Sequence, residues 1–197
     1  MVVQFKNTPK TIALTGPRMS GKDKVCKKFL KLNNIPTFDA DLAFKFILNY
    51  DEEVRNKAKR FFGDNSFFGM YINNAFFDSD RKIQKLLEIA EEKVFESFHR
   101  WRKKQNTKYV IFMFAGIFEF PFNMKNFHSI INVFAPIDVR QMRVQYALGE
   151  DMDHILDDEY SPEKKNVRSD YIIHNYDGLN LESQVYNVHN KIIKQIS

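Results

Sequence analysis

The chain has 197 residues, of which 44% are hydrophobic and 28% charged, and its formal net charge is +5. This size and composition are typical of one globular domain and exclude a disordered chain, a collagen-like repeat and a disulfide-rich scaffold. The one cysteine, Cys26, cannot form an internal disulfide, and no apolar run approaches the roughly 18 residues that span a bilayer. We therefore expect one cytoplasmic domain over residues 1–197, without signal peptide or membrane anchor.

The first third of the chain alternates short apolar runs with amphipathic patterns. Residues 11–15 (TIALT) form a β-rich apolar run that ends at Gly16, which predicts a buried strand. From Gly21 to about residue 33, apolar residues recur at helical spacing, which predicts a helix with Cys26 in the core. Three further elements, one strand and two helices, are predicted at residues 35–38, 41–48 and 52–62.

The rest of the chain continues the same alternation. A long amphipathic helix is predicted over residues 80–104, and the almost continuously apolar residues 109–114 (YVIFMF) suit a central parallel strand that is buried on both faces. The last predicted elements are strands at 130–134 and 171–173 and helices from about 138 and about 181. This alternation implies an α/β fold with a doubly wound parallel sheet and helices on both faces.

The turn after the first strand carries the clearest functional motif. Residues 16–22 match the pattern G-x-x-x-x-G-K between a predicted strand and a predicted helix. There, backbone N–H groups and the helix dipole hold phosphate oxygens, and Lys22 reaches the β and γ phosphates. This context favours a phosphate loop over an ordinary glycine-containing turn. The expected nucleotide-binding residues are Gly16, Pro17, Arg18, Met19, Ser20, Gly21, Lys22, Asp23 and Lys24.

Asp23 departs from the pattern, because this position usually has a Ser or Thr whose hydroxyl ligates Mg²⁺. A carboxylate also binds Mg²⁺, directly or through a water molecule, so Asp23 is a candidate metal ligand. The alternative is that Asp23 caps the helix start and contributes nothing to the metal. Both hypotheses stay open at this point.

Residues 11 to about 67 resemble the dephospho-CoA kinase family. The likeness runs from LTGPRMSGKDKVCKKFLKLNNIPTFDADLAFKFI through EEVRNKAKRFFGDNSF, and Asp39-Ala40-Asp41 lies where the family has Asp-Ala-Asp after its second strand. A looser likeness continues through YVIFMFAGIFEF, FAPIDVRQMR and SDYIIHNYDG. The resemblance implies a three-layer P-loop kinase fold with an acceptor-side helical region at about 52–104 and a helical lid at about 144–168.

The same resemblance implies a role for individual residues. Asp39 corresponds to the base that accepts the acceptor's proton, Arg143 to the lid arginine and Asn175 to a residue beside the ATP adenine. The implied acceptor-binding residues are Asp41, Lys45, Phe118 and Glu119. Asp41 is also the expected N-cap of the helix at 41–48, and capping alone would explain it.

The activity that the resemblance implies is ATP-dependent phosphoryl transfer to the ribose 3′-hydroxyl of dephospho-coenzyme A, with Mg²⁺ bridging the phosphates. Lys22, Asp39 and Arg143 are the expected catalytic residues. The expected partner is a small molecule, dephospho-coenzyme A or another nucleotide, and the expected state is a monomer or a weak homo-oligomer.

Several departures from the family pattern keep two alternatives open. Lys45 replaces the family's arginine, and Met113 and Ala115 replace its aspartate and proline. The lid at 149–159 has no arginine, and its six acids are Glu150, Asp151, Asp153, Asp157, Asp158 and Glu159. The SGKD ending of the phosphate loop resembles deoxynucleoside monophosphate kinases. The alternatives are therefore a nucleoside monophosphate kinase and an inactive nucleotide-binding relative.

The remaining motifs favour structural interpretations. The basic run at 99–104 (HRWRKK) places an aromatic ring between cations, as in nucleic-acid-binding proteins, but cations at a helix C-terminus stabilise its dipole and face solvent. We favour the second interpretation. Residues 151–154 begin like a calcium loop and then fail at the position that needs glycine, where Leu156 stands. The five histidines lack the spacing of a zinc site.

Overall fold

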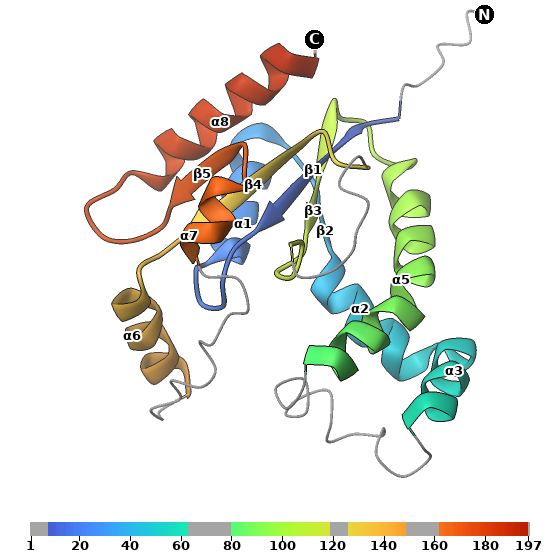
Figure 1. The fold of residues 1–197 in the computed structure, drawn as a ribbon. Coiled ribbons are helices and arrows are strands. Elements are labelled where there is room, and N and C mark those ends of the chain that lie inside the picture. The colour runs from blue at the N-terminus through green and yellow to red at the C-terminus, as the bar shows by residue number, and fades with distance from the viewer. Residues whose placement is uncertain (1–7, 63–79, 119–125, 149–161, 197) are drawn as a thin grey trace, which may run out of the picture. The chain divides into compact units, whose positions relative to one another are not determined.

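The computed structural model describes residues 8–62, 80–118, 126–148 and 162–196. The chain divides into two compact units, the first formed by Met1–Phe38 and Arg102–Ser197 and the second by Asp39–Trp101. The first unit contains the sheet. The second unit contains the helices of the stretch that lies, in sequence, between the two segments of the first unit (Figure 1).

The sheet has five strands in the order β2-β3-β1-β4-β5. The strands are β1 (Lys10–Thr15), β2 (Thr37–Asp39), β3 (Tyr109–Met113), β4 (Ser129–Phe134) and β5 (Tyr171–His174). β1 pairs in parallel with β3 and β4, and β4 pairs in parallel with β5. The predicted α/β fold with a central parallel sheet is confirmed. Because β1 and β4 are neighbours that lie far apart in sequence, the sheet reverses its winding beside β1, where α/β folds bind ligands.

Two helices cover one face of this sheet. α1 (Lys22–Asn33) and α8 (Leu181–Ile196) contact each other, and α8 also lies beside β5 (Figure 1). One buried cluster joins Val25 and Phe29 of α1 to Val185 and Ile192 of α8. Alternate strand residues complete it, among them Ile12, Leu14, Ile131 and Val133. Cys26 belongs to the same cluster and is buried in the core, as predicted.

The opposite face of the sheet holds polar residues at the carboxyl ends of its central strands. Thr15 and Asn132 are register partners on β1 and β4, and both are fully buried. The short helix α7 (Pro162–Val167) contacts β4, where the Asn132 amide nitrogen donates to Asn166 Oδ1 at 2.7 Å. α6 (Ile137–Leu148) follows β4 in the same unit. Helices therefore contact both faces of the sheet, as the sequence predicted.

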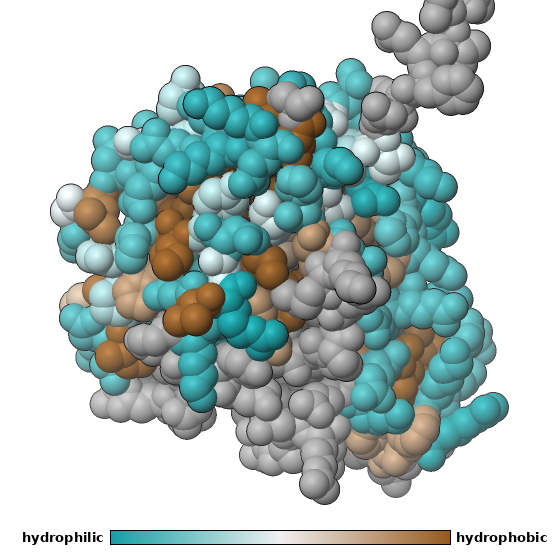
Figure 2. All heavy atoms as spheres, turned by 45° about the horizontal axis from the view of Figure 1, so that its top comes forward, coloured by the Kyte–Doolittle hydropathy of each residue, from teal (hydrophilic) through white to brown (hydrophobic). Residues whose placement is uncertain are grey.

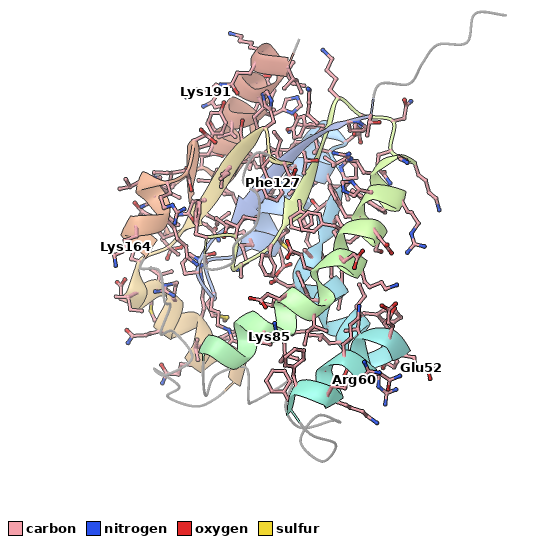
Figure 3. The ribbon with its side chains drawn as sticks, turned by 45° about the vertical axis from the view of Figure 1, so that its right-hand side comes forward. Glu52, Arg60, Lys85, Phe127, Lys164 and Lys191 are labelled. Atoms are coloured by element: carbon pink, nitrogen blue, oxygen red, sulfur yellow. The ribbon has the colours of Figure 1, made fainter. Side chains whose placement is uncertain are left out.

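The second unit contains α2 (Ala40–Tyr50), α3 (Glu52–Phe62) and most of α5 (Asp80–Arg102). Lys93 of α5 forms an ion pair with Glu53 of α3 at 3.0 Å, and the Lys85 ammonium lies 4.7 Å from the centre of the Phe61 ring. Both contacts tie α5 to α3. Figure 3 labels Lys85 on α5 and Arg60 on α3. On α5 itself, Trp101 stacks on Phe98, with 6.2 Å between ring centres.

The element boundaries agree with the sequence predictions to within two residues. The shift of the second strand has a local reason. It was predicted at 35–38 but spans Thr37–Asp39. α1 ends with Asn34 in the left-handed region, where Asn34 N–H donates to Leu30 O and Ile35 N–H donates to Phe29 O. This αL cap is often accompanied by an apolar residue just beyond the helix. The buried Ile35 takes that place, in the same core cluster as Phe29, so it lies in the cap and not in the strand.

Two further predictions about local structure were wrong or incomplete. The N-cap of α2 is Asp39 and not Asp41, because Asp39 Oδ1 accepts a hydrogen bond from Leu42 N–H at 2.9 Å and the helix begins at Ala40. α7 was not predicted, although its first residue is Pro162, the residue type that favours a first helical position. Its six residues are too few for a periodic apolar pattern.

The basic run at the end of α5 does not face solvent along its whole length. Arg100, Lys103 and Lys104 are exposed, but Arg102 is partly buried and donates to Thr11 Oγ1 at 2.8 Å. Burial also lowers the pKa of Arg102. The arginine therefore helps to anchor the start of β1.

Among the described residues, no helix is long and apolar enough to cross a membrane.

A fully buried tyrosine and a partly buried histidine join the start of β3 to α8. Tyr109 is fully buried, and its hydroxyl lies 2.8 Å from His189 Nδ1. Burial raises the pKa of Tyr109 and lowers the pKa of His189 from its ordinary value of 6.5. The folded state therefore favours neutral His189, whereas the unfolded state takes up a proton below about pH 6.5.

We expect this pair to make the free energy of unfolding depend on pH. The contribution of His189 is fully present above pH 6.5 and is lost as the pH falls below it, because the unfolded state then binds more protons than the folded state. Thermal unfolding measured between about pH 8 and pH 5 should show this decline, and it should be smaller in His189→Gln. Exposed His128→Gln is the matched control. Equal pH dependence in wild type and His189→Gln would contradict the assignment.

Candidate nucleotide-binding site

The predicted phosphate loop, residues 16–22, leaves the carboxyl end of β1 inside the first unit. Thr15 ends the strand fully buried, and its hydroxyl donates to Ala115 O just beyond β3 at 2.8 Å. Gly16 has φ +152°, and a Cβ there would lie 2.5 Å from Val133 O of β4. The first glycine of the motif is therefore required by the close approach of two backbones.

The second glycine of the motif begins α1. Gly21 has φ +88° and is the N-cap of the helix without a side-chain hydrogen bond to its first turn. The N–H groups of the first helical turn have no intrahelical acceptors and, at this uncapped start, carry the positive end of the helix dipole. Such an end is suited to phosphate oxygens. The structure therefore gives residues 16–22 the local form that the motif predicts.

Lys22 lies at the start of α1 and turns back over the loop. Its ammonium donates to Gly16 O at 3.0 Å and to Pro17 O at 3.2 Å, and the side chain is partly buried. An ammonium group has three N–H bonds in total. The contacts hold the charge of Lys22 beside the residues that a bound triphosphate would contact.

Three successive carbonyl groups of the loop accept hydrogen bonds from side chains that are distant in sequence. Arg18 O accepts from Arg140 Nη1 at 3.3 Å, and Met19 O accepts from Arg143 Nη1 at 2.8 Å. Ser20 O accepts from the Asn175 amide nitrogen at 2.7 Å. We call the side chains of Arg140, Arg143 and Asn175 the carbonyl clamp. Arg140 and Arg143 lie on α6, and Asn175 follows β5 directly.

The members of the carbonyl clamp also contact one another. Arg143 Nη2 donates to the backbone carbonyl of Asn175 at 2.6 Å, and Asn175 N–H donates to Phe134 O at 2.8 Å. Burial lowers the pKa of Arg143, and the charge of nearby Asp177 opposes this effect. Because a guanidinium is not deprotonated in proteins, Arg143 stays charged at neutral pH. A positive charge is thus held beside the phosphate loop.

A buried lysine lies at the same edge of the sheet. Lys165 of α7 is 1% exposed, and its ammonium donates to Ala115 O at 3.3 Å, the carbonyl that Thr15 also contacts. Its sequence neighbour Lys164 is exposed and extends outward from α7 in Figure 3. Nothing in the sequence separates these two lysines, since both stand in one short polar segment. This buried cation was therefore missed by the sequence analysis.

The predicted acceptor-side residues fall on several elements. Asp39 and Asp41 lie at the start of α2 and Lys45 is exposed on the same helix, all in the second unit. Phe118 lies in the first unit, where it is 6% exposed and the Arg168 guanidinium lies 4.8 Å from the centre of its ring. Glu119 and the acidic part of the lid at 149–159 lie outside the described residues.

Asp39 has a structural role that leaves part of its carboxylate available. As the N-cap of α2 it uses Oδ1 for the hydrogen bond from Leu42 N–H. This contact occupies one of the two carboxylate oxygens. Asp39 directly follows Thr37 and Phe38 of β2, so the residue stands at the carboxyl end of an outer parallel strand, as predicted from sequence.

Asp23 is exposed on the first turn of α1. Its carboxylate is a hard oxygen donor of the kind Mg²⁺ prefers, and it stands next to Lys22 in the sequence. The donor therefore fits a nucleotide-bound Mg²⁺. Among the described residues, no group of three or more histidine, cysteine, aspartate or glutamate side chains could hold a metal ion without the nucleotide.

Comparison with known proteins gives a consistent assignment. The family model described as dephospho-CoA kinase matches residues 10–180. No curated protein sequence matches the chain.

Solved structures match the chain at low sequence identity. TT1252 from Thermus thermophilus is 18% identical, with coverage of 97% of this chain and 100% of that chain and a TM-score of 0.76. A shikimate kinase from Acinetobacter baumannii is 14% identical, with coverage of 97% and 96% and a TM-score of 0.55. A shikimate kinase from Bacteroides thetaiotaomicron is 18% identical, with coverage of 93% and 98% and a TM-score of 0.54. These likenesses show the fold of P-loop kinases.

Proposed function

The chain belongs to the dephospho-CoA kinase family, and from this premise we propose that it transfers the γ-phosphoryl group of ATP to the ribose 3′-hydroxyl of dephospho-coenzyme A. Family and fold indicate an ATP-dependent P-loop kinase. The acceptor and the catalytic residues are the subject of the proposal. The observation that carries it is the family match over residues 10–180 together with a phosphate loop built as the motif requires.

The phosphate side of the reaction is assigned to the first unit. N–H groups of residues 16–24 would hold the phosphate oxygens, and the Lys22 ammonium would neutralise charge on the β and γ phosphates. Arg143 donates through Nη1 and Nη2 to backbone carbonyls, and a guanidinium has five N–H bonds in all. We assign its remaining N–H bonds to the transferring phosphoryl group. Asn175 stands at the family's adenine-side position.

The acceptor side is assigned to Asp39. Its carboxylate accepts the proton of the 3′-hydroxyl, the hydroxyl oxygen forms a bond to the γ phosphorus, and the bond from the γ phosphorus to the bridging oxygen of ADP breaks. Asp41, Lys45, Phe118 and Glu119 are assigned to acceptor binding. The hydrogen bond that Asp39 Oδ1 accepts from Leu42 N–H also fixes the orientation of this proposed base.

Mg²⁺, which P-loop kinases typically use, would be held by Asp23 and the nucleotide phosphates and would neutralise charge that develops on them. We expect Asp23→Ala to raise the Mg²⁺ concentration for half-maximal activity by about 10-fold to 100-fold, with kcat near the wild-type value at saturating Mg²⁺. A Mg²⁺ titration of ADP release measures this. Exposed Lys27→Ala on the same helix is the control. An unchanged Mg²⁺ requirement would show that Asp23 is only an acidic residue in the first turn of α1, where it interacts favourably with the helix dipole.

A coupled ADP-release assay with ATP and Mg²⁺ tests the proposed acceptor. We expect turnover with dephospho-coenzyme A and none with a panel of nucleoside and deoxynucleoside monophosphates. Turnover with a monophosphate would replace the proposal by the kinase class that the SGKD ending resembles. ATP binding without turnover on any acceptor would identify an inactive relative.

A further inference from the structure

The three side chains of the carbonyl clamp point to a function that the family assignment does not give them. A loop that directs its N–H groups inward, toward phosphate, directs carbonyl groups outward, and buried carbonyls need donors. Here the carbonyls of Arg18, Met19 and Ser20 receive donors from α6 and from the residue that follows β5. Each donor supports the outer side of the loop.

Part of the phosphate loop has a backbone conformation that a residue with a side chain does not adopt readily. Met19 has φ 59° and Gly21 has φ 88°, both in the left-handed region, which is unfavourable for a methionine. Strained backbone of this kind persists where the surrounding structure determines it. The carbonyl clamp supports this strained part of the loop, because Met19 O and Ser20 O are two of its three acceptors.

Asn175 is held through both its backbone and its side chain. It is 5% exposed, its N–H donates to Phe134 O, and its carbonyl accepts from Arg143, so its backbone is fixed on both sides of the residue. Its amide nitrogen packs directly on the loop, where a Cβ on Gly21 would lie 2.1 Å from it. The second glycine of the motif is thus required by Asn175 as well as by its backbone conformation.

We propose that Asn175 is a positioning residue for the phosphate loop: together with Arg140 and Arg143 it fixes the loop so that its N–H groups meet the phosphates. Asn175 then acts on the triphosphate through Ser20 and not on the adenine base through its own side chain. Because Arg143 lies on α6 and contacts both Met19 O and Asn175 O, the same clamp joins the loop to the helix from which the lid begins. The proposal deepens the proposed function, since it rests on ATP as the nucleotide.

Binding of a triphosphate without a base separates the two roles of Asn175. Inorganic tripolyphosphate offers the phosphate loop its ligand and offers an adenine pocket nothing. We expect Asn175→Leu, which keeps the volume and removes the donor, to weaken ATP and tripolyphosphate by a similar factor of about 10-fold or more in calorimetric titrations. Asn175→Ala repeats the test if the leucine variant does not fold. Exposed Asn187→Ala on α8 is the matched control and should bind both ligands normally.

Two outcomes would overturn the proposal. If ATP binding weakens and tripolyphosphate binding does not, Asn175 contacts the base. If neither changes, the hydrogen bond to Ser20 O does not position the loop. Thermal unfolding without ligand serves as the stability control, because a variant that is folded at the titration temperature cannot lose affinity through unfolding. The readout is binding, so failure of the proposed acceptor would leave this test unaffected.

Discussion

Replacing Lys22 with methionine is expected to lower kcat for ADP formation by about 100-fold to 1,000-fold, the cost of removing one charged donor from a developing phosphoryl charge. Methionine keeps most of the length of the side chain and removes the ammonium that contacts Gly16 O and Pro17 O. The measurement is steady-state ADP release at saturating ATP and acceptor.

Lys27→Met is the matched control for this substitution. Lys27 is exposed on the same helix, and its replacement by methionine removes the same charge from the protein. It should leave kcat within about twofold of wild type, as surface substitutions usually do. Equal loss in the two variants would mean that net charge, not the position of Lys22, explains the effect. Wild-type turnover in Lys22→Met would remove Lys22 from the catalytic residues.

Replacing Asp39 with asparagine is expected to lower kcat by about 100-fold to 10,000-fold, because the amide cannot accept the proton of the acceptor hydroxyl. The same change should preserve the fold, since asparagine caps helices about as well as aspartate and can accept the hydrogen bond from Leu42 N–H. ATP affinity should stay within about twofold of wild type, because the change is on the acceptor side. ADP release and ATP titration measure the two quantities.

Asp51→Asn provides the matched control for the base. Asp51 Oδ1 accepts a hydrogen bond from Val54 N–H at 3.0 Å at the start of α3, so the same substitution is made at a second helix cap. It should leave turnover unchanged. Normal turnover in Asp39→Asn would show that Asp39 is a structural cap only. Loss of turnover in both variants would attribute the effect to capping in the second unit.

The order of strands and helices could be predicted from the sequence because each element carries its own periodic pattern. The buried runs at β1 and β3 and the amphipathic pattern of α5 are local signals, and their bounds were close to those observed. α7 was not predictable in this way, because six residues do not complete two helical turns.

The phosphate loop was predictable because its geometry is encoded within seven residues. Both glycines have positive φ values, and a Cβ on Gly16 would lie only 2.5 Å from Val133 O, so the structure requires the two glycines that the motif contains. The exact cap of α2 was not predictable, because Asp39 and Asp41 are equally good caps and their choice depends on where the helix begins.

The supports of the loop could not be predicted from the sequence. Met19 and Arg143 are 124 positions apart, and Ser20 and Asn175 are 155 positions apart. No local pattern marks such contacts, which depend on how β4, α6 and β5 lie around the loop. The resemblance placed Arg143 and Asn175 at the nucleotide, whereas their hydrogen bonds to the loop carbonyls became visible only in the structure. The buried Lys165 is a further case.

The face of the protein in Figure 2 gives no further indication of a partner. The face seen in Figure 2 is largely hydrophilic, with hydrophobic side chains in separate spots. Such spots are normal for a globular protein. Exposed apolar residues of α2 include Leu42, Phe46 and Tyr50. The proposed function therefore depends on the nucleotide site and on the family match.

The most direct test of the proposed activity is to identify the product. Wild-type protein and Asp39→Asn would be incubated with ATP, Mg²⁺ and dephospho-coenzyme A, followed by mass spectrometry and ³¹P NMR. We expect the wild type to add one phosphoryl group to dephospho-coenzyme A, at the ribose 3′ position, with one ADP released for each product formed and little product in the variant. Unchanged dephospho-coenzyme A in the presence of bound ATP, or a phosphoryl group at another position, would contradict it.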